Sequence, residues 1–317
     1  MTQQMATLLN PLNTLPQTPG WVPSFRGQTP ENMAFRSGAV LLVLDQLIGD
    51  ARHGVPVPLL ANRLALSAAT ATSKLEGRLA RETDIRDAYH LTPPGEARGP
   101  DGDLLAFWRR SVRLRGGRTD ALEALIGAAL AAEAHVWLHE GHERASTHGP
   151  LAGCVSVLRR VLDADDRAER VACLLSDIVL ARALNWRVVL PISASRLTKK
   201  ALRDLTAPGP GGELAVQGRI LDAAEALIRQ ARDLARYAGA LRSVAPKLRA
   251  KGAAAAVELF LTEDAVAPAS MLSPRIQGTN IPMTDRAARR FCDRLVELGV
   301  ARELTGRPTF RLYGIAP

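Results

Sequence analysis

The sequence predicts a mainly α-helical protein, in which a multi-helix body is followed by a C-terminal winged helix with a short β-hairpin. Apolar residues make up 47% of the 317 residues, enough to bury a sizeable core, whereas aromatic residues make up only 4%. Aliphatic, Ala-rich and Leu-rich sequences of this kind are typical of packed helices rather than of β-sandwiches or barrels. Apolar residues recur at helical spacing until a basic helix, a glycine and two short extended runs close the chain.

Three parts follow one another along the chain. Residues 1–30 carry five prolines among Gln, Thr and Asn, which predicts an extended tail rather than a helix. Trp21 and Phe25 are its candidate anchors to the body. Residues 31–243 are predicted to form an all-helical body, and residues 246–317 a winged-helix domain.

The body is predicted to contain a series of amphipathic or buried helices. Their expected ranges are 31–48, 59–75, 82–90, 103–114, 120–139, 150–162, 167–184 and 214–241. The β-branched run at 188–191 predicts a loop or a stub strand between two of them. The segment APGPGG at 207–212 is the strongest break in the chain.

The segment 284–298 predicts a basic amphipathic helix. Thr284 suits its N-cap, and Gly299 is placed to end it in a left-handed conformation. At 100° per residue, one side gathers the apolar residues Ala288, Phe291, Cys292, Leu295 and Leu298. The opposite side carries Arg286, Arg289, Arg290 and Arg294. Upstream, 253–266 and 268–276 predict the two helices that precede it in a winged helix.

Two short extended runs follow this helix, at 300–304 and 309–313, and Thr-Gly-Arg-Pro joins them. In the second run we expect Phe310 and Leu312 to face one way and Arg311 and Tyr313 the other. A helix, a glycine stop and a hairpin with a basic tip are the closing parts of a winged helix.

A winged helix of this charge predicts DNA as the partner. The whole chain has a net charge of +9 and an isoelectric point near 10.2, which suits a polyanion. The N-terminal half of a recognition helix approaches base edges, and the wing contacts phosphates. The candidate DNA-binding residues are therefore Thr284, Arg286, Arg289, Arg290, Arg294, Arg307 and Arg311.

The local charge leaves an alternative open. From Arg242 to the end, the chain carries twelve Lys and Arg and seven Asp and Glu, a net charge of only +5. On the helix itself, the charges of Asp285, Asp293 and Glu297 offset those of three arginines. In this alternative the arginines only keep an exposed helix face soluble in water, and the winged helix mediates protein packing or homodimerisation.

Three blocks of the chain, at 31–50, 244–268 and 285–314, carry a resemblance to a known family. They read ENMAFRSGAVLLVLDQLIGD, VAPKLRAKGAAAAVELFLTEDAVAP and DRAARRFCDRLVELGVARELTGRPTFRLYG. Through these blocks the chain resembles the bacterial family of domain of unknown function 1403. The resemblance covers nearly the whole chain. This resemblance implies no particular activity.

A second resemblance is to Fic-domain proteins, which transfer nucleotide monophosphates onto hydroxyl groups. The ending at 295–307 is similar to the winged-helix tail of many of them. Many also carry an inhibitory helix with the pattern [Ser/Thr]-x-x-x-Glu-Gly, and the segment TSKLEG at 72–77 fits it. The resemblance implies that the inhibitory glutamate, Glu76 here, pairs with the second arginine of the core motif.

The candidate for that core motif, HPFxxGNGRxxR in the family, is RRVLDADDRAER at 159–170. It keeps two arginines, Arg167 and Arg170, but Arg159 replaces the general-base histidine and cannot accept a proton at neutral pH. Ala164 and Asp166 replace the glycines whose N–H groups wrap phosphate. We therefore expect a catalytically dead Fic-like scaffold with a vestigial pair, Glu76 and Arg170, and no enzyme activity.

Other chemistry has little support. His135, His139 and His142 share one helical face, which makes them a weak candidate metal site, but H-E-x-x-H is absent and Gly141 suggests that the helix ends there. An active enzyme would need this cluster or an unrecognised site. Phosphate-loop, dinucleotide-binding and nucleophile-elbow motifs are missing, so we expect no cofactor and no metal.

The sequence also bears on the compartment. The three cysteines, Cys154, Cys173 and Cys292, form no paired framework and suit buried positions in a reducing environment. The N-terminus lacks the charged and apolar regions of a signal peptide, and no apolar run approaches the ~20 residues of a membrane span. We expect a cytoplasmic protein without a membrane partner.

Overall fold

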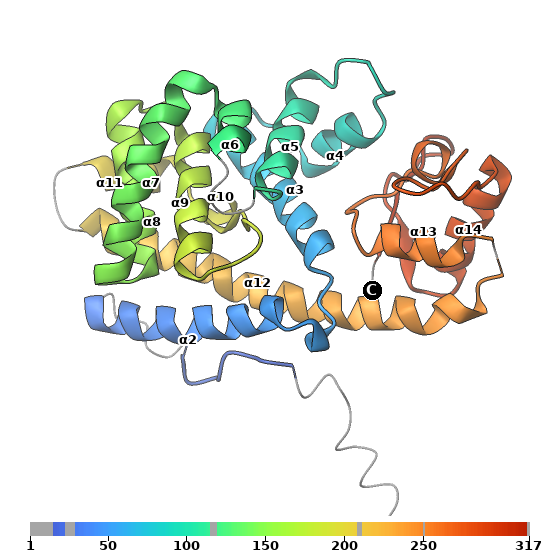
Figure 1. The fold of residues 1–317 in the computed structure, drawn as a ribbon, viewed down its shortest axis with the longest axis horizontal. Coiled ribbons are helices and arrows are strands. Elements are labelled where there is room, and N and C mark those ends of the chain that lie inside the picture. Colours follow the sequence, from blue (N-terminus) through green and yellow to red (C-terminus); the bar gives the residue numbers. More distant parts are fainter. Residues whose placement is uncertain (1–14, 23–28, 115–118, 208–210, 250, 316–317) are drawn as a thin grey trace, which may run out of the picture. The chain divides into compact units, whose positions relative to one another are not determined.

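The computed structural model describes residues 15–22, 29–114, 119–207, 211–249 and 251–315, and it is mainly helical (Figure 1). The first helices are α2 (Pro30–Gly49), η3 (Ala51–His53), α3 (Val57–Leu75), α4 (Glu82–His90), α5 (Gly99–Ser111), α6 (Thr119–Ile126), α7 (Ala128–His148) and α8 (Pro150–Ala164). They are followed by α9 (Glu169–Ala183), α10 (Ile192–Arg196), α11 (Lys199–Thr206) and α12 (Gly211–Val244). The last elements are η4 (Ala245–Lys247), α13 (Ala253–Phe260), η5 (Pro268–Leu272), α14 (Asp285–Glu297), β1 (Ala301–Glu303) and β2 (Tyr313–Ile315).

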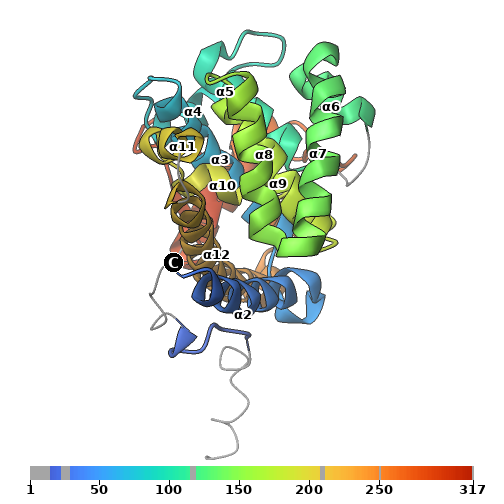
Figure 2. The same cartoon turned by 90° about the vertical axis from the view of Figure 1, so that its left-hand side faces the viewer.

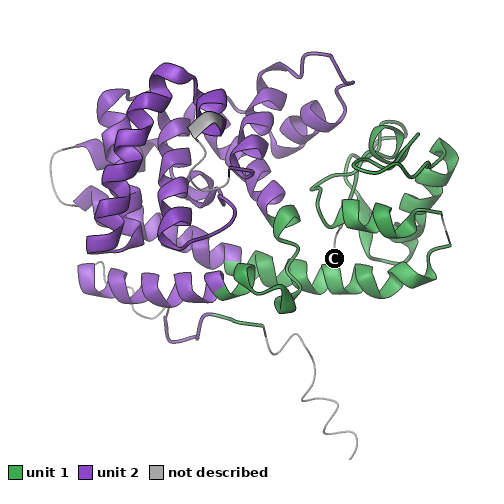
Figure 3. Ribbon diagram, in the orientation of Figure 1, with its two compact units in different colours: residues 1–17, 46–60, 228–317 green, residues 18–45, 61–227 purple. Residues whose placement is uncertain are grey.

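The chain forms two compact units (Figure 3). Unit 1 comprises residues 1–17, 46–60 and 228–317, and unit 2 comprises residues 18–45 and 61–227. Three of the four limits between them fall within α2, α3 and α12. The mainly helical class predicted from composition is confirmed, with one two-stranded sheet near the C-terminus of the described chain. Within that part of the chain, every helix is too short or too polar to cross a bilayer.

The core of unit 2 is built around α7, α8 and α9, which pack side by side (Figures 1 and 2). Their facing sides carry aliphatic residues such as Leu138, Leu158 and Leu174, all fully buried. Cys154 and Cys173 lie in the same core as free thiols, as predicted for small apolar residues, and Cys292 is likewise buried in unit 1. Mainly aliphatic packing, with a few buried aromatics such as Trp137, thus accounts for the composition.

Gly141 does not end a helix, contrary to our expectation. It lies in the interior of α7, where an added Cβ would collide with Val157 of α8 and lie 3.0 Å from Val179 of α9. Gly153 of α8 faces it, with an ideal Cβ only 2.5 Å from the Gly141 carbonyl oxygen. The two glycines bring the backbones of α7 and α8 into close contact, which explains their positions in helix interiors despite the cost in chain entropy.

The single helix predicted over 120–139 is instead two helices, α6 and α7. Gly127 separates them with a φ of +87°, a conformation that L side chains rarely adopt. In contrast, α4 spans 82–90 as predicted, and α14 lies within one residue of its predicted limits. The run at 188–191 is a loop, with Val189 and Leu190 buried.

One of the two predicted anchors of the N-terminal segment, Trp21, contacts a helix of the body within unit 2. The ring of Trp21 lies 5.8 Å from that of Phe35 of α2, although Trp21 is still 55% exposed. Phe25, the other predicted anchor, lies outside the described residues.

Unit 1 ends in a small helix-and-strand module. Thr284 caps α14 as predicted, because its hydroxyl accepts a hydrogen bond from Ala287 N at 3.3 Å, and Gly299 follows the helix with a φ of +69°. Strands β1 and β2 pair antiparallel with Ala301 opposite Ile315. Val266 pairs with Tyr313 on the other edge of β2 through hydrogen bonds of 2.7 and 2.9 Å.

Several predicted limits in this module are wrong; the short second helix, for example, ends at Leu272 rather than 276. Helix α13 ends at Phe260 rather than 266, because the chain then extends to bring Val266 against β2. The second strand begins at Tyr313 rather than 309, because Pro308 lacks a donor and Phe310 adopts a φ of +55°, and both are incompatible with a regular ladder. Phe310 and Leu312 therefore do not share a face: Phe310 is 74% exposed and Leu312 is buried.

The close contact of α7 and α8 predicts the effect of adding one methyl group. Gly153→Ala would place a Cβ 2.6 Å from that of Ala145, so we expect the free energy of unfolding to fall by about 1–3 kcal/mol. Gly239→Ala in α12 is the matched control, because no atom lies within 4 Å of its Cβ position, and it should be neutral or stabilising. Urea denaturation measures both, and a Gly153→Ala variant as stable as the wild type would contradict this packing.

Candidate functional site

The arginines of α14 lie on its exposed side. Arg286, Arg289, Arg290 and Arg294 are all exposed, whereas the opposite side of the helix buries Ala288, Phe291, Cys292 and Leu295. Leu298, expected on the apolar side, is half-buried at the C-cap. The phenyl ring of Phe291 lies 6.3 Å from that of Phe260 in α13, so the apolar side faces the interior of unit 1. The sequence-based division of this helix into two sides is confirmed.

Two of the four arginines are held by acidic residues of the same helix. Arg289 lies 2.7 Å from Asp285, and Arg294 lies 2.9 Å from Glu297. Arg286 and Arg290 form no ion pair with any residue in the described ranges. The positive charge that α14 presents to solvent is therefore concentrated on these two side chains in the N-terminal half.

The hairpin adds further exposed cations. Arg307 and Arg311 are exposed, and the Nε of Arg311 donates to the Arg307 carbonyl oxygen at 3.1 Å. Arg302 on β1 is also exposed, a basic position that the sequence analysis did not single out. Its signal was present in the sequence, because Arg302 alternates with the buried Ala301 along an expected strand.

A carboxylate shapes the turn that leaves β1. Glu303 accepts hydrogen bonds from the backbone N–H of Thr305 at 2.8 Å and of Gly306 at 2.7 Å, and from the Thr305 hydroxyl. Burial opposes ionisation, but these hydrogen bonds outweigh it and lower the pKa of Glu303. The hairpin is tied to α14 by the hydroxyl of Tyr313, which donates to Asp293 at 3.1 Å.

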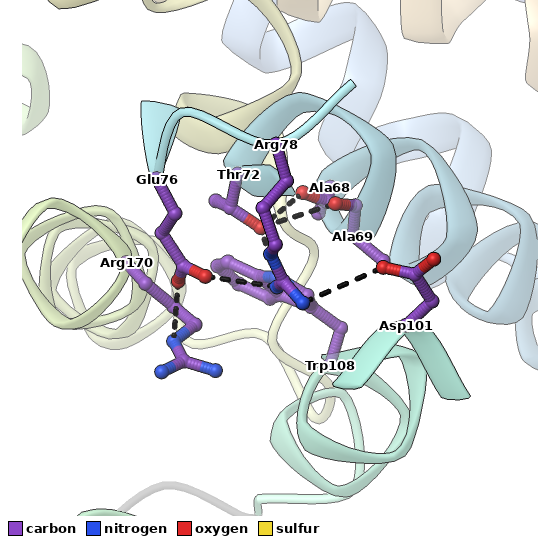
Figure 4. Close-up of polar contacts among 8 residues, drawn as sticks. All are labelled: Ala68, Ala69, Thr72, Glu76, Arg78, Asp101, Trp108 and Arg170. Carbon is purple, nitrogen blue, oxygen red and sulfur yellow. Dashed lines mark hydrogen bonds and ion pairs between the residues drawn. The ribbon is translucent and has the colours of Figure 1, made fainter. Parts of the chain in front are cut away.

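A second cluster in unit 2 is centred on Glu76, just after α3 (Figure 4). The Nε of Arg170 in α9 lies 3.2 Å from Glu76 Oε1, so the predicted approach of these two residues is observed. Arg78 donates to the other carboxylate oxygen of Glu76 at 2.9 Å and reaches Asp101 of α5 at 3.4 Å. The guanidinium of Arg170 also lies 4.9 Å from the ring centre of Phe107.

The buried polar groups of Trp108 and Thr72, next to this cluster, are paired by hydrogen bonds. The indole N–H of Trp108 donates to Thr72 Oγ1 at 3.0 Å, and that hydroxyl donates to Ala68 O at 2.7 Å. Both residues are fully buried, so an unpaired hydroxyl or indole N–H here would be costly. The network fixes the last turn of α3 against α5 and thereby positions Glu76.

The loop between α8 and α9 lacks the features of a phosphate cradle. Asp165 Oδ1 accepts the backbone N–H of Arg167 at 2.9 Å, so a carboxylate occupies this amide donor. Arg167 itself is exposed and does not join the Glu76 cluster. Arg159 is bound elsewhere, to the Leu205 carbonyl oxygen and, at 2.7 Å, to Glu213. A phosphate brought to this loop would meet negative charge.

The three histidines of α7, His135, His139 and His142, lie around one cavity. Among the described residues no group of three His, Cys, Asp or Glu is arranged to hold a metal ion. His139 is 75% exposed and pairs with Glu143 at 3.4 Å. All three histidines line a cavity of about 440 Å³ together with Arg182, whose cationic side chain disfavours a metal ion there.

Asp177 is a buried acid that the sequence analysis missed. It lies inside α9, where Oδ1 accepts Ser193 N at 2.8 Å and Oδ2 has no hydrogen-bond partner among the described residues. Burial raises its pKa to about 8, against the hydrogen bond from Ser193. A single acidic residue within the apolar run VACLLSDIVLA was the available signal.

The fold and these sites define a mainly helical protein with an exposed basic helix beside a hairpin and a separate Glu-Arg cluster. The chain belongs to the family described as protein of unknown function DUF1403, whose model matches residues 6–315. No curated protein and no solved structure matches it. The first predicted resemblance is thus confirmed, and the resemblance to Fic-domain proteins stays a prediction.

The raised pKa of Asp177 predicts a pH dependence of stability. Its proton is retained in the folded state but lost from the unfolded state above about pH 4, so the unfolded state binds fewer protons and rising pH favours unfolding. The wild type should lose about 2 kcal/mol of stability between pH 6 and pH 8 through this group. Asp177→Asn should remove this part of the dependence in urea denaturation; equal pH profiles for both proteins would contradict a protonated Asp177.

Proposed function

We propose that residues 253–315 form a winged helix and that this module binds duplex DNA. In this proposal α13 is the first helix, η5 the short second one, and α14 the recognition helix. Residues 304–312 form the wing, and the protein acts as a non-enzymatic regulator or plasmid-associated factor. The order of helices and strands along the chain supports the winged-helix assignment.

The strand pairing supports the same assignment. Val266 follows the first helix and pairs with Tyr313 of β2, whose other edge pairs with β1. A strand between the first two helices that pairs with the last strand, beside the strand that follows the recognition helix, is the arrangement expected of a winged helix. Burial of Val266, Tyr313 and Ile315 places this small sheet against the helices of unit 1.

The observation that carries the DNA proposal is the exposure of Arg286 and Arg290 without an acidic partner among the described residues. Both lie in the first half of α14, the part of a recognition helix that meets base edges in the major groove. Arg302, Arg307 and Arg311 are exposed on the adjoining hairpin, where they suit phosphate contacts.

The ion pairs of Arg289 and Arg294 do not remove these side chains from the proposal. Both pairs join exposed residues of one helix, and such pairs contribute only about 0–1 kcal/mol. A phosphate or a guanine edge is a comparable or stronger partner for an arginine than these carboxylates. Exchanging the carboxylate for a DNA group on binding therefore costs little free energy. Their acidic neighbours instead reduce non-specific attraction to polyanions.

Substituting the two unpartnered arginines tests the proposal. Arg286→Ala with Arg290→Ala should weaken binding of a fluorescent genomic duplex at least about tenfold, because two contacts to bases or phosphates are lost. The control is Arg52→Ala in unit 1, an exposed arginine outside the module, which should bind as the wild type does. Fluorescence anisotropy gives the affinities, and equal binding by all three proteins would exclude α14 as the contact surface.

A second candidate function has one specific observation in its favour. The ion pair between Arg170 and Glu76 joins residues 94 positions apart in the arrangement that the Fic-like resemblance implies. In this alternative the body is a catalytically dead Fic-like scaffold that binds a protein partner. Asp165, Asp166 and Arg159, at positions where that chemistry needs glycines or a histidine, support the absence of catalysis.

The alternative predicts that the ion pair of Glu76 and Arg170 is present but that the protein transfers no nucleotide. Neither the wild type nor Glu76→Ala should label itself or a partner with a fluorescent nucleotide, because removing Glu76 restores no base and no phosphate cradle. An active Fic-domain enzyme in the same assay is the positive control. Transfer of the label by either protein would contradict the assignment as a pseudoenzyme.

A further inference from the structure

Four of the seven residues that line a pocket beside α5 are arginines. The pocket has a volume of about 320 Å³, lies within unit 2, and shares no lining residue with the Glu76 cluster. Its charged and aromatic lining consists of Tyr89, Arg98, Asp103, Arg109, Arg110 and Arg113. Four arginines and one aspartate give this lining a net charge of +3.

The periodicity of α5 explains why these side chains share one face. Asp103, Arg110 and Arg113 are spaced by seven and three residues, so they follow one another along the solvent side of the helix and its C-terminal end. The opposite side buries Leu105 and Trp108. Ala106, between Asp103 and Arg110, is small and leaves room for the pocket.

Two guanidinium groups at this pocket have a fixed position. The guanidinium carbons of Arg98 and Arg109 lie 4.9 and 5.0 Å from the ring centre of Tyr89, within the range of cation–π contacts. Arg109 is only 3% exposed, so its cation sits in the protein wall rather than in bulk solvent. Arg98, Arg110 and Arg113 are exposed around the pocket, and an anion held between like charges relieves their repulsion.

We propose that this pocket binds a small molecule that carries a diphosphate group. Arginine presents its donors as a planar fork that matches phosphate oxygens, and several arginines around one concave site suit adjacent phosphates. The volume of the pocket lies at the lower end of the range for small-molecule sites, about 300–1,000 Å³. This inference does not depend on DNA binding by α14.

Calorimetric titration of the full-length protein with inorganic pyrophosphate tests the proposal. Arg110 and Arg113 are exposed, so Arg110→Ala with Arg113→Ala should keep the helical circular dichroism while weakening pyrophosphate binding at least about tenfold. Asp103→Asn removes the acidic residue and should strengthen binding a few-fold. Arg286→Ala with Arg290→Ala is the matched control and should leave pyrophosphate binding unchanged.

The other outcomes separate the pocket proposal from the DNA proposal. Absence of saturable pyrophosphate binding, or equal binding by the Arg110 and Arg113 variant, would overturn the proposal. Loss of DNA binding in that variant, together with no pyrophosphate binding by the wild type, would make the pocket part of a DNA surface and would also overturn it. A wild type that binds pyrophosphate but not DNA would support the pocket and refute only the role of α14.

Discussion

The burial of one side of α14 fixes where its arginines lie, and the functional proposal depends on it. Phe291 and Leu295 are almost fully buried, which stabilises this orientation by about 1.5–3 kcal/mol for each side chain. The exposed ion pairs of the same helix contribute about 0–1 kcal/mol each. Apolar packing therefore decides the rotation of the helix about its axis, and the hydrogen bond from Tyr313 to Asp293 then fixes the hairpin beside it.

The parts of the fold that local chemistry controls could be predicted from the sequence, and those that a packing partner controls could not. The helix at 82–90 has a clear stop after it, and α14 has a capping threonine and a final glycine. Gly141 and Gly127 have the same local propensity, yet one permits close helix packing and the other breaks a helix. Only the facing residues of α8 distinguish the two cases. For the same reason, the end of α13 depends on the pairing of Val266 with Tyr313 of β2.

The candidate sites divide in the same way. The basic side of α14 followed from periodicity, whereas the contact of Glu76 with Arg170 followed from a family resemblance and no spacing rule would have found it. The bridge from Arg78 to Asp101 and the hydrogen bond from Trp108 to Thr72 join separate helices and were not foreseen. Together these contacts hold α3, α5 and α9 in a defined arrangement, which is a structural role that the Glu76 cluster fills whether or not it descends from a nucleotide-transfer site.

Hydrogen–deuterium exchange of the full-length protein, with and without a saturating genomic duplex, tests the central claim most directly. Amide exchange reports solvent access segment by segment, so it locates the contact surface without any substitution. If α14 and the wing meet DNA, exchange slows at residues 284–298 and 304–312 and stays unchanged on α7 and α8. If exchange at residues 284–298 and 304–312 is unchanged while DNA is bound, another surface of the protein binds the DNA.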